Sequence, residues 1–178
     1  MRSRDWSKVL AGLALASPIP LVARAETYLS QDQAATVLFP GVKLQLRVME
    51  LSPDDMASIE KASGEKVPSP HVRAAWGPGG EAMFVDAVIG KHAYITYAVG
   101  ISSDGKVRGV EIMDYRETVG YQVREDRWRR QFVGKTSRDP VRIDKDIQNI
   151  SGATLSSSHV TNGVRRVLRT YDVLKSRS

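Results

Sequence analysis

The chain has 178 residues, a net charge of +6 and no cysteine. The lack of cysteine excludes disulfides, thiolate metal sites and a lipid anchor on cysteine. Four of the 26 basic residues and one of the 20 acidic residues lie in the first 25 positions, so the remainder carries a net charge of only +3. A charge of this size is ordinary for a globular domain and gives no argument for nucleic-acid binding.

The N-terminus has the pattern of a secretory signal peptide. Basic residues at positions 2, 4 and 8 precede a short apolar run at Val9–Ala16, and Ala23-Arg24-Ala25 fits an A-x-A cleavage site. The run is far shorter than the ~20 residues of a spanning helix, which disfavours a membrane anchor, and no later run is long enough to span. We therefore expect residues 1–25 to be removed, leaving an exported chain in the periplasm or another extracytoplasmic space, with no transmembrane segment.

Residues 26–81 predict an N-terminal extension of the domain, made of helices, a strand and a loop. A capping-box pattern at Ser30–Gln33 opens a helix that ends near Phe39-Pro40. Ser52-Pro53 and the acids after it open a second helix that stops at Gly64, and residues 42–51 between the two helices alternate like a strand. Residues 64–81 are rich in Gly and Pro and predict a loop with one short strand at 71–76.

Residues 82–178 predict the main domain, which begins with a strand at 82–89. Two further runs of β-forming residues, 92–101 and 106–113, flank Ser103-Asp104-Gly105, and Asp-Gly is a strong hairpin signal. A last helix is predicted over 159–174, where apolar residues recur at three- and four-residue steps. The fold class is therefore α+β: an antiparallel sheet with helices packed on one side, in a single domain.

A basic cluster lies between the hairpin and the last helix. Arg124, Arg127, Arg129 and Arg130 surround Trp128. We interpret them as a solvated helix face with Trp128 and Phe132 packed inward at i, i+4. The alternative is that these arginines face an anionic redox partner or the membrane surface.

The segment Ser151-Gly152-Ala153-Thr154-Leu155-Ser156 is suited to binding a phosphate. Gly152 and Ala153 leave room for a bulky group and permit a tight turn. Serines 156–158 are favoured N-caps, so we expect Thr154 just before a helix N-terminus, where free N–H groups and the helix dipole favour an anion. The alternative is a Gly-Ala turn before a Ser-capped helix, with no ligand.

A second element, Glu117-Thr118-Val119-Gly120-Tyr121, follows the predicted hairpin. In this order the two segments resemble the E-T-x-G and S-G-A-T-x-[ST] motifs of the FMN-binding domain family, which includes flavinylated subunits of the sodium-pumping NADH:quinone reductase and of Rnf complexes. The resemblance covers about residues 82–174. It implies that Thr154 carries FMN through a phosphoester bond. The cofactor-binding residues it implies are Thr154, Ser151, Gly152, Ala153, Leu155, Ser156, Glu117, Thr118, Gly120 and Tyr121, with Tyr115 a further candidate for a ring contact.

The function implied by the resemblance is electron transfer by an exported flavoprotein, and not stand-alone catalysis. An FAD-dependent FMN transferase would attach the flavin, and the redox partner would be a membrane reductase or a cytochrome. No catalytic residue of the chain's own is expected. No metal site is expected either, because His71, His92 and His159 lack ligand-like spacing.

Two positions depart from the family pattern. The family usually has an aspartate three residues before the motif serine, where this chain has Gln148, and the nearest acids are Asp144 and Asp146. Val119 replaces a common proline. The Gln148 departure keeps open a non-covalent FMN-binding module, and a flavin-free interaction subunit of an exported complex is the third alternative.

Overall fold

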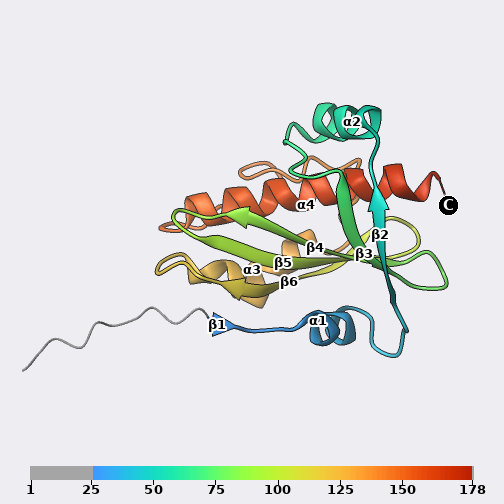
Figure 1. Cartoon of the computed structure of the whole chain (residues 1–178). Coiled ribbons are helices and arrows are strands. Elements are labelled where there is room, and N and C mark those ends of the chain that lie inside the picture. Colours follow the sequence, from blue (N-terminus) through green and yellow to red (C-terminus); the bar gives the residue numbers. More distant parts are fainter. Residues whose placement is uncertain (1–25, 178) are drawn as a thin grey trace, which may run out of the picture.

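A computed structural model describes residues 26–177, so the signal peptide expected at 1–25 lies outside the described residues. The centre of the fold is a six-stranded antiparallel sheet with the order β1-β6-β5-β4-β3-β2 (Figure 1). The strands are β1 (Glu26–Thr27), β2 (Gln45–Glu50), β3 (His71–Trp76), β4 (Ala82–Ile89), β5 (Tyr94–Ile101) and β6 (Val107–Tyr115). The predicted α+β class with an antiparallel sheet is confirmed.

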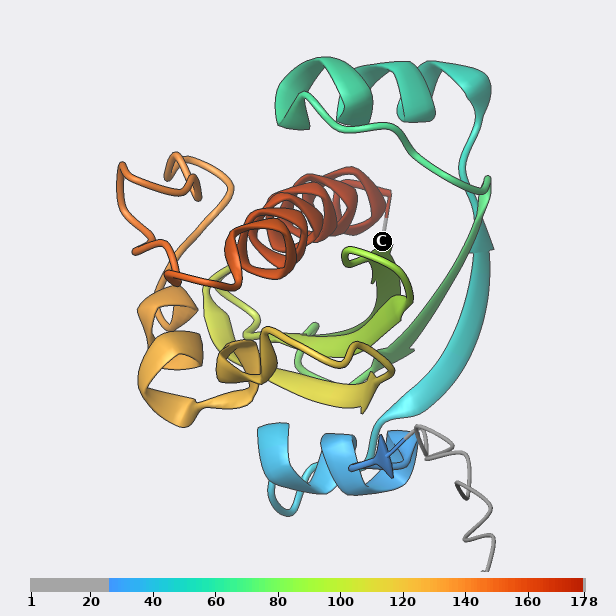
Figure 2. The ribbon, with the colours of Figure 1, turned by 90° about the vertical axis from the view of Figure 1, so that its left-hand side faces the viewer.

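Helices cover both faces of this sheet (Figure 2). The long helix α4 (Thr154–Lys175) packs on one face, and α1 (Gln31–Leu38) packs on the other, where it contacts β4, β5 and β6. The sequence predicted helices packed on one side of the sheet; α1 covers the other side in addition. The reason is visible in β5, where Tyr97 and Val99 are buried toward α4 while Ala98 between them is buried toward α1.

Local capping signals set the two N-terminal helices. Ser30 forms a complete capping box with Gln33 at the start of α1, as predicted. Ser52 does the same with Asp55 at the start of α2 (Pro53–Ser63). The latter helix ends at Gly64, whose φ of 75° lies in the left-handed region that glycine adopts without strain.

Strands β3 and β4 stay together for only part of their length. Their pairing covers Ala74–Trp76 against Ala82–Phe84, whereas β4 pairs with β5 over all eight of its residues. Beyond this short ladder β2 and β3 separate from the rest of the sheet and lead to α2 (Figure 1). The separation leaves a pocket beside the second half of α4.

The segment between β6 and α4 is mostly irregular. The single helix predicted for the arginine cluster is divided into η1 (Tyr121–Arg124), α3 (Asp126–Arg129) and η2 (Arg130–Phe132). Trp128 and Phe132 are nevertheless buried in edge-to-face contact, with ring centroids 5.2 Å apart, as the i, i+4 spacing predicted. Their packing fixes this segment to the core.

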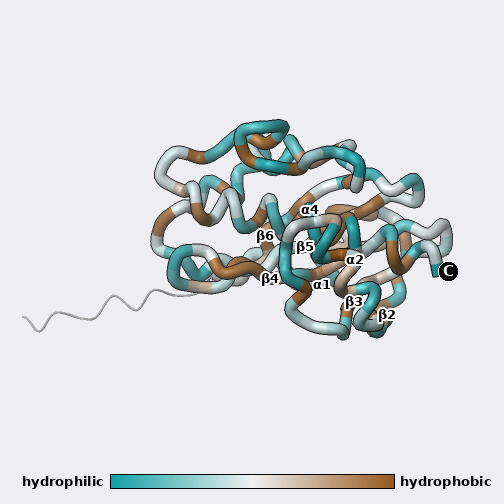
Figure 3. The backbone as a smooth tube through the Cα atoms, turned by 90° about the horizontal axis from the view of Figure 1, so that it is seen from above, coloured by the Kyte–Doolittle hydropathy of each residue, from teal (hydrophilic) through white to brown (hydrophobic). Residues whose placement is uncertain are grey.

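Apolar and hydrophilic positions are interleaved along the tube in Figure 3. In the described part of the chain, no helix combines the length and apolar character needed to cross a bilayer.

Candidate functional site

The fold brings the two sequence motifs into direct contact at Gly120. This residue has φ +87°, and a Cβ placed on it would lie 2.9 Å from the Tyr115 hydroxyl, 3.1 Å from Ser156 Oγ and 3.2 Å from the Cβ of Ala153. Both the backbone angle and the space require glycine. The E-T-x-G loop therefore packs against the first turn of α4.

Thr154 is the first residue of α4, and its side chain is exposed. The N-cap is Ala153, and no side chain caps the helix. The serines expected to cap it lie inside the first turn instead, with Ser156 and Ser157 buried. The helix thus presents uncapped N–H groups and the positive end of its dipole beside the threonine hydroxyl, which is an arrangement that favours a phosphate.

The neighbours of Thr154 leave this helix end open. Ser151, Gly152 and Leu155 are exposed, and a Cβ on Gly152, at φ +80°, would meet nothing within 4 Å. Ala153 is buried, with its N–H donated to the carbonyl of Ile150 at 2.9 Å. The turn is therefore fixed by its backbone while its outer surface is free for a ligand.

Glu117 ties the E-T-x-G loop to the β4–β5 turn. Its Oε1 accepts hydrogen bonds from the backbone N–H groups of His92 (2.6 Å) and Ala93 (2.9 Å). Burial would raise the pKa of Glu117, but the N–H donors of Ala93, His92 and Lys91 outweigh it and hold the pKa below its usual value. Glu117 is thus a carboxylate that positions this end of the sheet.

Tyr115 is held by the same junction. Its hydroxyl donates to the carbonyl of Val119 at 2.5 Å and is hydrogen-bonded to Ser156. Burial raises the pKa of Tyr115, and the Ser156 contact opposes that rise only in part. The Tyr115 hydroxyl therefore supports the E-T-x-G loop.

Exposed apolar side chains gather around this junction. The described residues include nine large exposed hydrophobic side chains, and five of them lie on the β4–β5 turn, the E-T-x-G loop and the start of α4. We call these five the apolar rim: Ile89, Tyr94, Val119, Tyr121 and Leu155. His159 contacts the carbonyl of Ile89 and so joins α4 to the same turn. An apolar ring system could pack on this surface.

An open groove of about 330 Å³ adjoins Ser151, and the sequence did not predict it. Two segments contribute to it, residues 122–131 and residues 148–151, and of these residues only Ser151 belongs to one of the two motifs. Amide side chains are its most frequent feature. Its lining consists of Gln122, Glu125, Arg127, Trp128, Gln131, Gln148, Asn149, Ile150 and Ser151.

Trp128 and Gln131 fix the loop that carries Gln148. The Trp128 indole N–H donates to the Gln148 carbonyl at 2.8 Å, and the Gln148 N–H donates to Gln131 Oε1 at 2.8 Å. The side chain of Gln148 remains exposed. An aspartate at this position would therefore project from the same fixed backbone.

Asp146 does not replace the missing aspartate, because other groups engage it. It accepts hydrogen bonds from the N–H groups of Val141 and Arg142 and pairs with Lys135 at 3.1 Å. Burial would raise the pKa of Asp146, but the Arg142 N–H and Lys135 lower it on balance. Asp144 is exposed, with φ 61°. The described residues contain no group of His, Asp and Glu side chains able to hold a metal ion.

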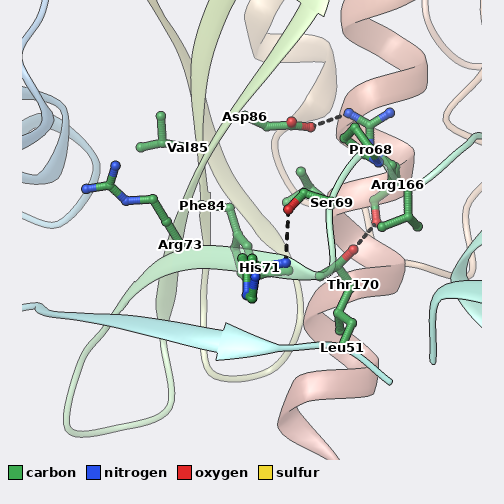
Figure 4. Close-up of a pocket in the computed structure, with 13 residues that line it drawn as sticks. Leu51, Pro68, Ser69, His71, Arg73, Phe84, Val85, Asp86, Arg166 and Thr170 are labelled. Carbon is green, nitrogen blue, oxygen red and sulfur yellow. Dashed lines mark hydrogen bonds and ion pairs between the residues drawn. The ribbon is translucent and has the colours of Figure 1, made fainter. Parts of the chain in front are cut away.

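A second pocket of about 200 Å³ lies where β3 and β4 separate, against the second half of α4 (Figure 4). Two of its charged groups pair with each other: Arg166 Nη2 lies 2.7 Å from Asp86 Oδ2, which also accepts the hydroxyl of Tyr97 at 2.8 Å. Neither motif contributes a residue to this pocket. The candidate site is therefore the junction at Thr154.

Most of the basic cluster is engaged in structure. Arg124 donates to the Tyr28 hydroxyl, Arg129 pairs with Glu111 at 2.6 Å, and Arg130 pairs with Asp126 at 2.5 Å. Arg127 differs: it is exposed and lines the groove beside Ser151.

Comparison with known proteins agrees with this placement. Residues 90–169 match the family model described as FMN-binding domain. Over 84 residues the chain is 33% identical to a subunit of the Na(+)-translocating ferredoxin:NAD(+) oxidoreductase complex of Acetobacterium woodii. The alignment covers 42% of this chain and 41% of that relative, so the chain spans about two fifths of the relative's length. The family match includes both motifs.

Proposed function

We propose that this chain, whose residues 90–169 match the FMN-binding domain family, is an exported electron carrier with FMN bound to Thr154 through a phosphoester bond. The observation that supports this most is the exposed Thr154 at the uncapped start of α4, packed against the E-T-x-G loop. When bound, FMN supplies one- and two-electron redox chemistry.

The residues at the junction fit the parts of this cofactor. The uncapped N–H groups of α4 suit the phosphate, and Gly152 leaves open space beside it. The apolar rim suits an aromatic ring system, and two of its members, Tyr121 and Leu155, directly follow Gly120 and Thr154 in the chain. Glu117, Thr118 and Gly120 support this surface, Glu117 through its bonds to the β4–β5 turn.

In this proposal the flavin is attached by a phosphoryl-group transfer from FAD. The Thr154 Oγ attacks the FMN phosphorus, the phosphoanhydride bond breaks, AMP leaves, and the hydroxyl proton passes to a base. Threonine is a poor nucleophile at its free pKa, so an FAD-dependent FMN transferase with Mg²⁺ supplies the base and the metal. This chain contributes the hydroxyl and the positive end of α4.

The proposed export and the proposed partners are supported by separate observations. The signal-peptide pattern of residues 1–25 supports an extracytoplasmic location, where the transferase would act. The similarity to one component of an oxidoreductase complex supports a role as a redox subunit, with a membrane reductase or a cytochrome as partner.

One observation favours a second candidate, a non-covalent FMN-binding module. Gln148 stands where the family usually has aspartate, and Asp146 is engaged elsewhere. A neutral amide there cannot orient a hydroxyl or a metal as a carboxylate would. The fold and the pocket are the same in both candidates.

The test is the intact mass of the full chain, produced with export and with a flavin transferase present. We expect a mass gain equal to FMN minus one water, located on the peptide that contains Thr154, and loss of that gain in Thr154→Ala. A yellow protein of unmodified mass that loses its colour in acid would support the non-covalent candidate. A colourless protein of unmodified mass would refute both.

A further inference from the structure

The groove beside Ser151 has polar groups without partners. Gln122 Oε1 is buried and has no hydrogen-bond partner among the described residues. An unpaired buried carbonyl oxygen is costly, and a ligand hydroxyl would remove that cost. Gln122 also lines the groove, so rotation of its amide toward the groove would give this oxygen a ligand hydroxyl as donor.

Some of the other polar side chains of the groove are hydrogen-bonded within the protein, and others are not. Gln131 is engaged through both ends of its amide, by Gln148 N–H and by the Trp128 carbonyl. Asn149 Oδ1 accepts from Ile150 N–H and Ser157 Oγ–H. Within residues 26–177, the exposed side chains of Gln148 and Arg127 have no hydrogen bond or ion pair to the protein.

The position of the groove relates it to Thr154. One wall is residues 148–151, which lead directly into the helix start, and the other wall begins at Gln122, which follows Tyr121 of the apolar rim. The groove therefore adjoins both the residues that lead to Thr154 and the residue that follows Tyr121 of the rim. The part of FMN that joins its phosphate to its ring is a chain of hydroxyl groups.

We propose that this groove is the ribityl-phosphate subsite, in which the Gln122 and Gln148 amides bind the ribityl hydroxyls and Arg127 pairs with the phosphate. Amides both donate to and accept from hydroxyl groups, so they suit a polyol. Glu125 can also accept from a hydroxyl but would repel a phosphate, so the phosphate is assigned to Arg127 and to the helix start that follows Ser151. The inference rests on FMN being the cofactor and does not depend on the covalent bond.

Three flavins that differ by one part each test the subsite. The chain is produced without a transferase, and its unmodified mass is verified. FMN, riboflavin and lumiflavin, which lacks the ribityl chain, are then titrated by quenching of flavin fluorescence. The wild-type chain should bind FMN most tightly and lumiflavin least tightly.

Each variant has its own expected pattern. Gln122→Leu should weaken FMN and riboflavin about tenfold and leave lumiflavin unchanged, because it removes a hydrogen bond to the ribityl chain. Arg127→Gln should weaken FMN alone, by about fivefold at low salt and less at high salt. Gln148→Leu repeats the Gln122 test at an exposed position, where the substitution does not endanger folding. Gln45→Leu and Arg138→Gln change exposed residues outside the groove and should alter none of the affinities.

Several results would overturn the subsite. Equal weakening of all three flavins by both Gln122→Leu and Gln148→Leu would mean that the amides do not recognise the ribityl chain. Unchanged affinities in all variants, or a wild-type chain that binds none of the flavins, would also refute it. The mass measurement decides the phosphoester bond independently, so a chain that shows the expected flavin pattern but gains no mass keeps the subsite and loses the covalent proposal.

Discussion

Replacement of Gly120 by alanine tests the contact between the two motifs most directly. The new Cβ would lie 2.9 Å from the Tyr115 hydroxyl, which is itself held by the Val119 carbonyl at 2.5 Å. It would also crowd Ser156 and Ala153. The matched control is Gly134→Ala, because Gly134 has a similar φ of +80° and a Cβ there would meet nothing within 4 Å.

The expected destabilisation has two parts. An L-residue in the left-handed region costs about 1–2 kcal/mol, and both variants carry this cost. Gly120→Ala adds overpacking, which costs about 1–3 kcal/mol where the neighbours cannot move apart. The difference between the two variants should therefore be about 2 kcal/mol.

Urea denaturation of the flavin-free chain measures this difference. With an m-value of about 2 kcal/mol/M, the midpoint of Gly120→Ala should lie about 1 M below that of Gly134→Ala. In the presence of the transferase, Gly120→Ala should also incorporate less flavin, while Gly134→Ala should match the wild type. Equal midpoints for the two variants would refute the described packing of the E-T-x-G loop on α4.

Three further predictions concern residues around the site. Because the pKa of Glu117 is lowered in the fold, its contribution to stability should be complete above its usual pKa of about 4.3 and lost as the pH falls through the lower folded value. The urea midpoints of wild type and Glu117→Gln should therefore converge as the pH falls below about 4.3. Arg166→Met should cost about 3 kcal/mol in urea denaturation by leaving Asp86 unpaired, yet flavin content per folded chain should not change, since this pocket is separate from Thr154. Gln148→Asp should raise the flavinylated fraction found by intact mass, and an unchanged fraction would show that the carboxylate has no part in the transfer.

The elements with short-range signals were predicted closely. The capping box at Ser30, the helix start at Ser52-Pro53, the Asp104-Gly105 turn and the stop at Gly64 each depend on a few adjacent residues, and the corresponding elements begin or end within a few residues of the expected positions. The juxtaposition of Glu117–Gly120 with Thr154 was implied only by the family resemblance. No periodicity in the sequence would bring these two segments together.

The remaining features depend on contacts between distant segments. The sequence of β5 alone does not tell whether Ala98 faces solvent or a second helix, because a small residue is compatible with both. The sequence analysis therefore did not predict α1 on the second face of the sheet. Serine is a good N-cap but also packs well inside a first turn, and the burial of Ser156 against Gly120 moved the helix start back to Thr154. The groove joins residues 122–131 to residues 148–151, which only the folded chain brings together.

The open form of the site is the form expected if the proposed phosphoester bond holds the cofactor. A ligand joined to Thr154 is present at an effective concentration of about millimolar or more, so weak contacts are enough to orient it. The apolar rim and the amide groove are both open to solvent, and Thr154 is exposed. A cofactor that is retained by its bond needs no enclosing cavity, and the exposed ring that results can approach a redox partner closely. A non-covalent carrier would need to bury more of its flavin for the same retention, so the openness around Thr154 favours the phosphoester bond over the non-covalent alternative that Gln148 keeps open.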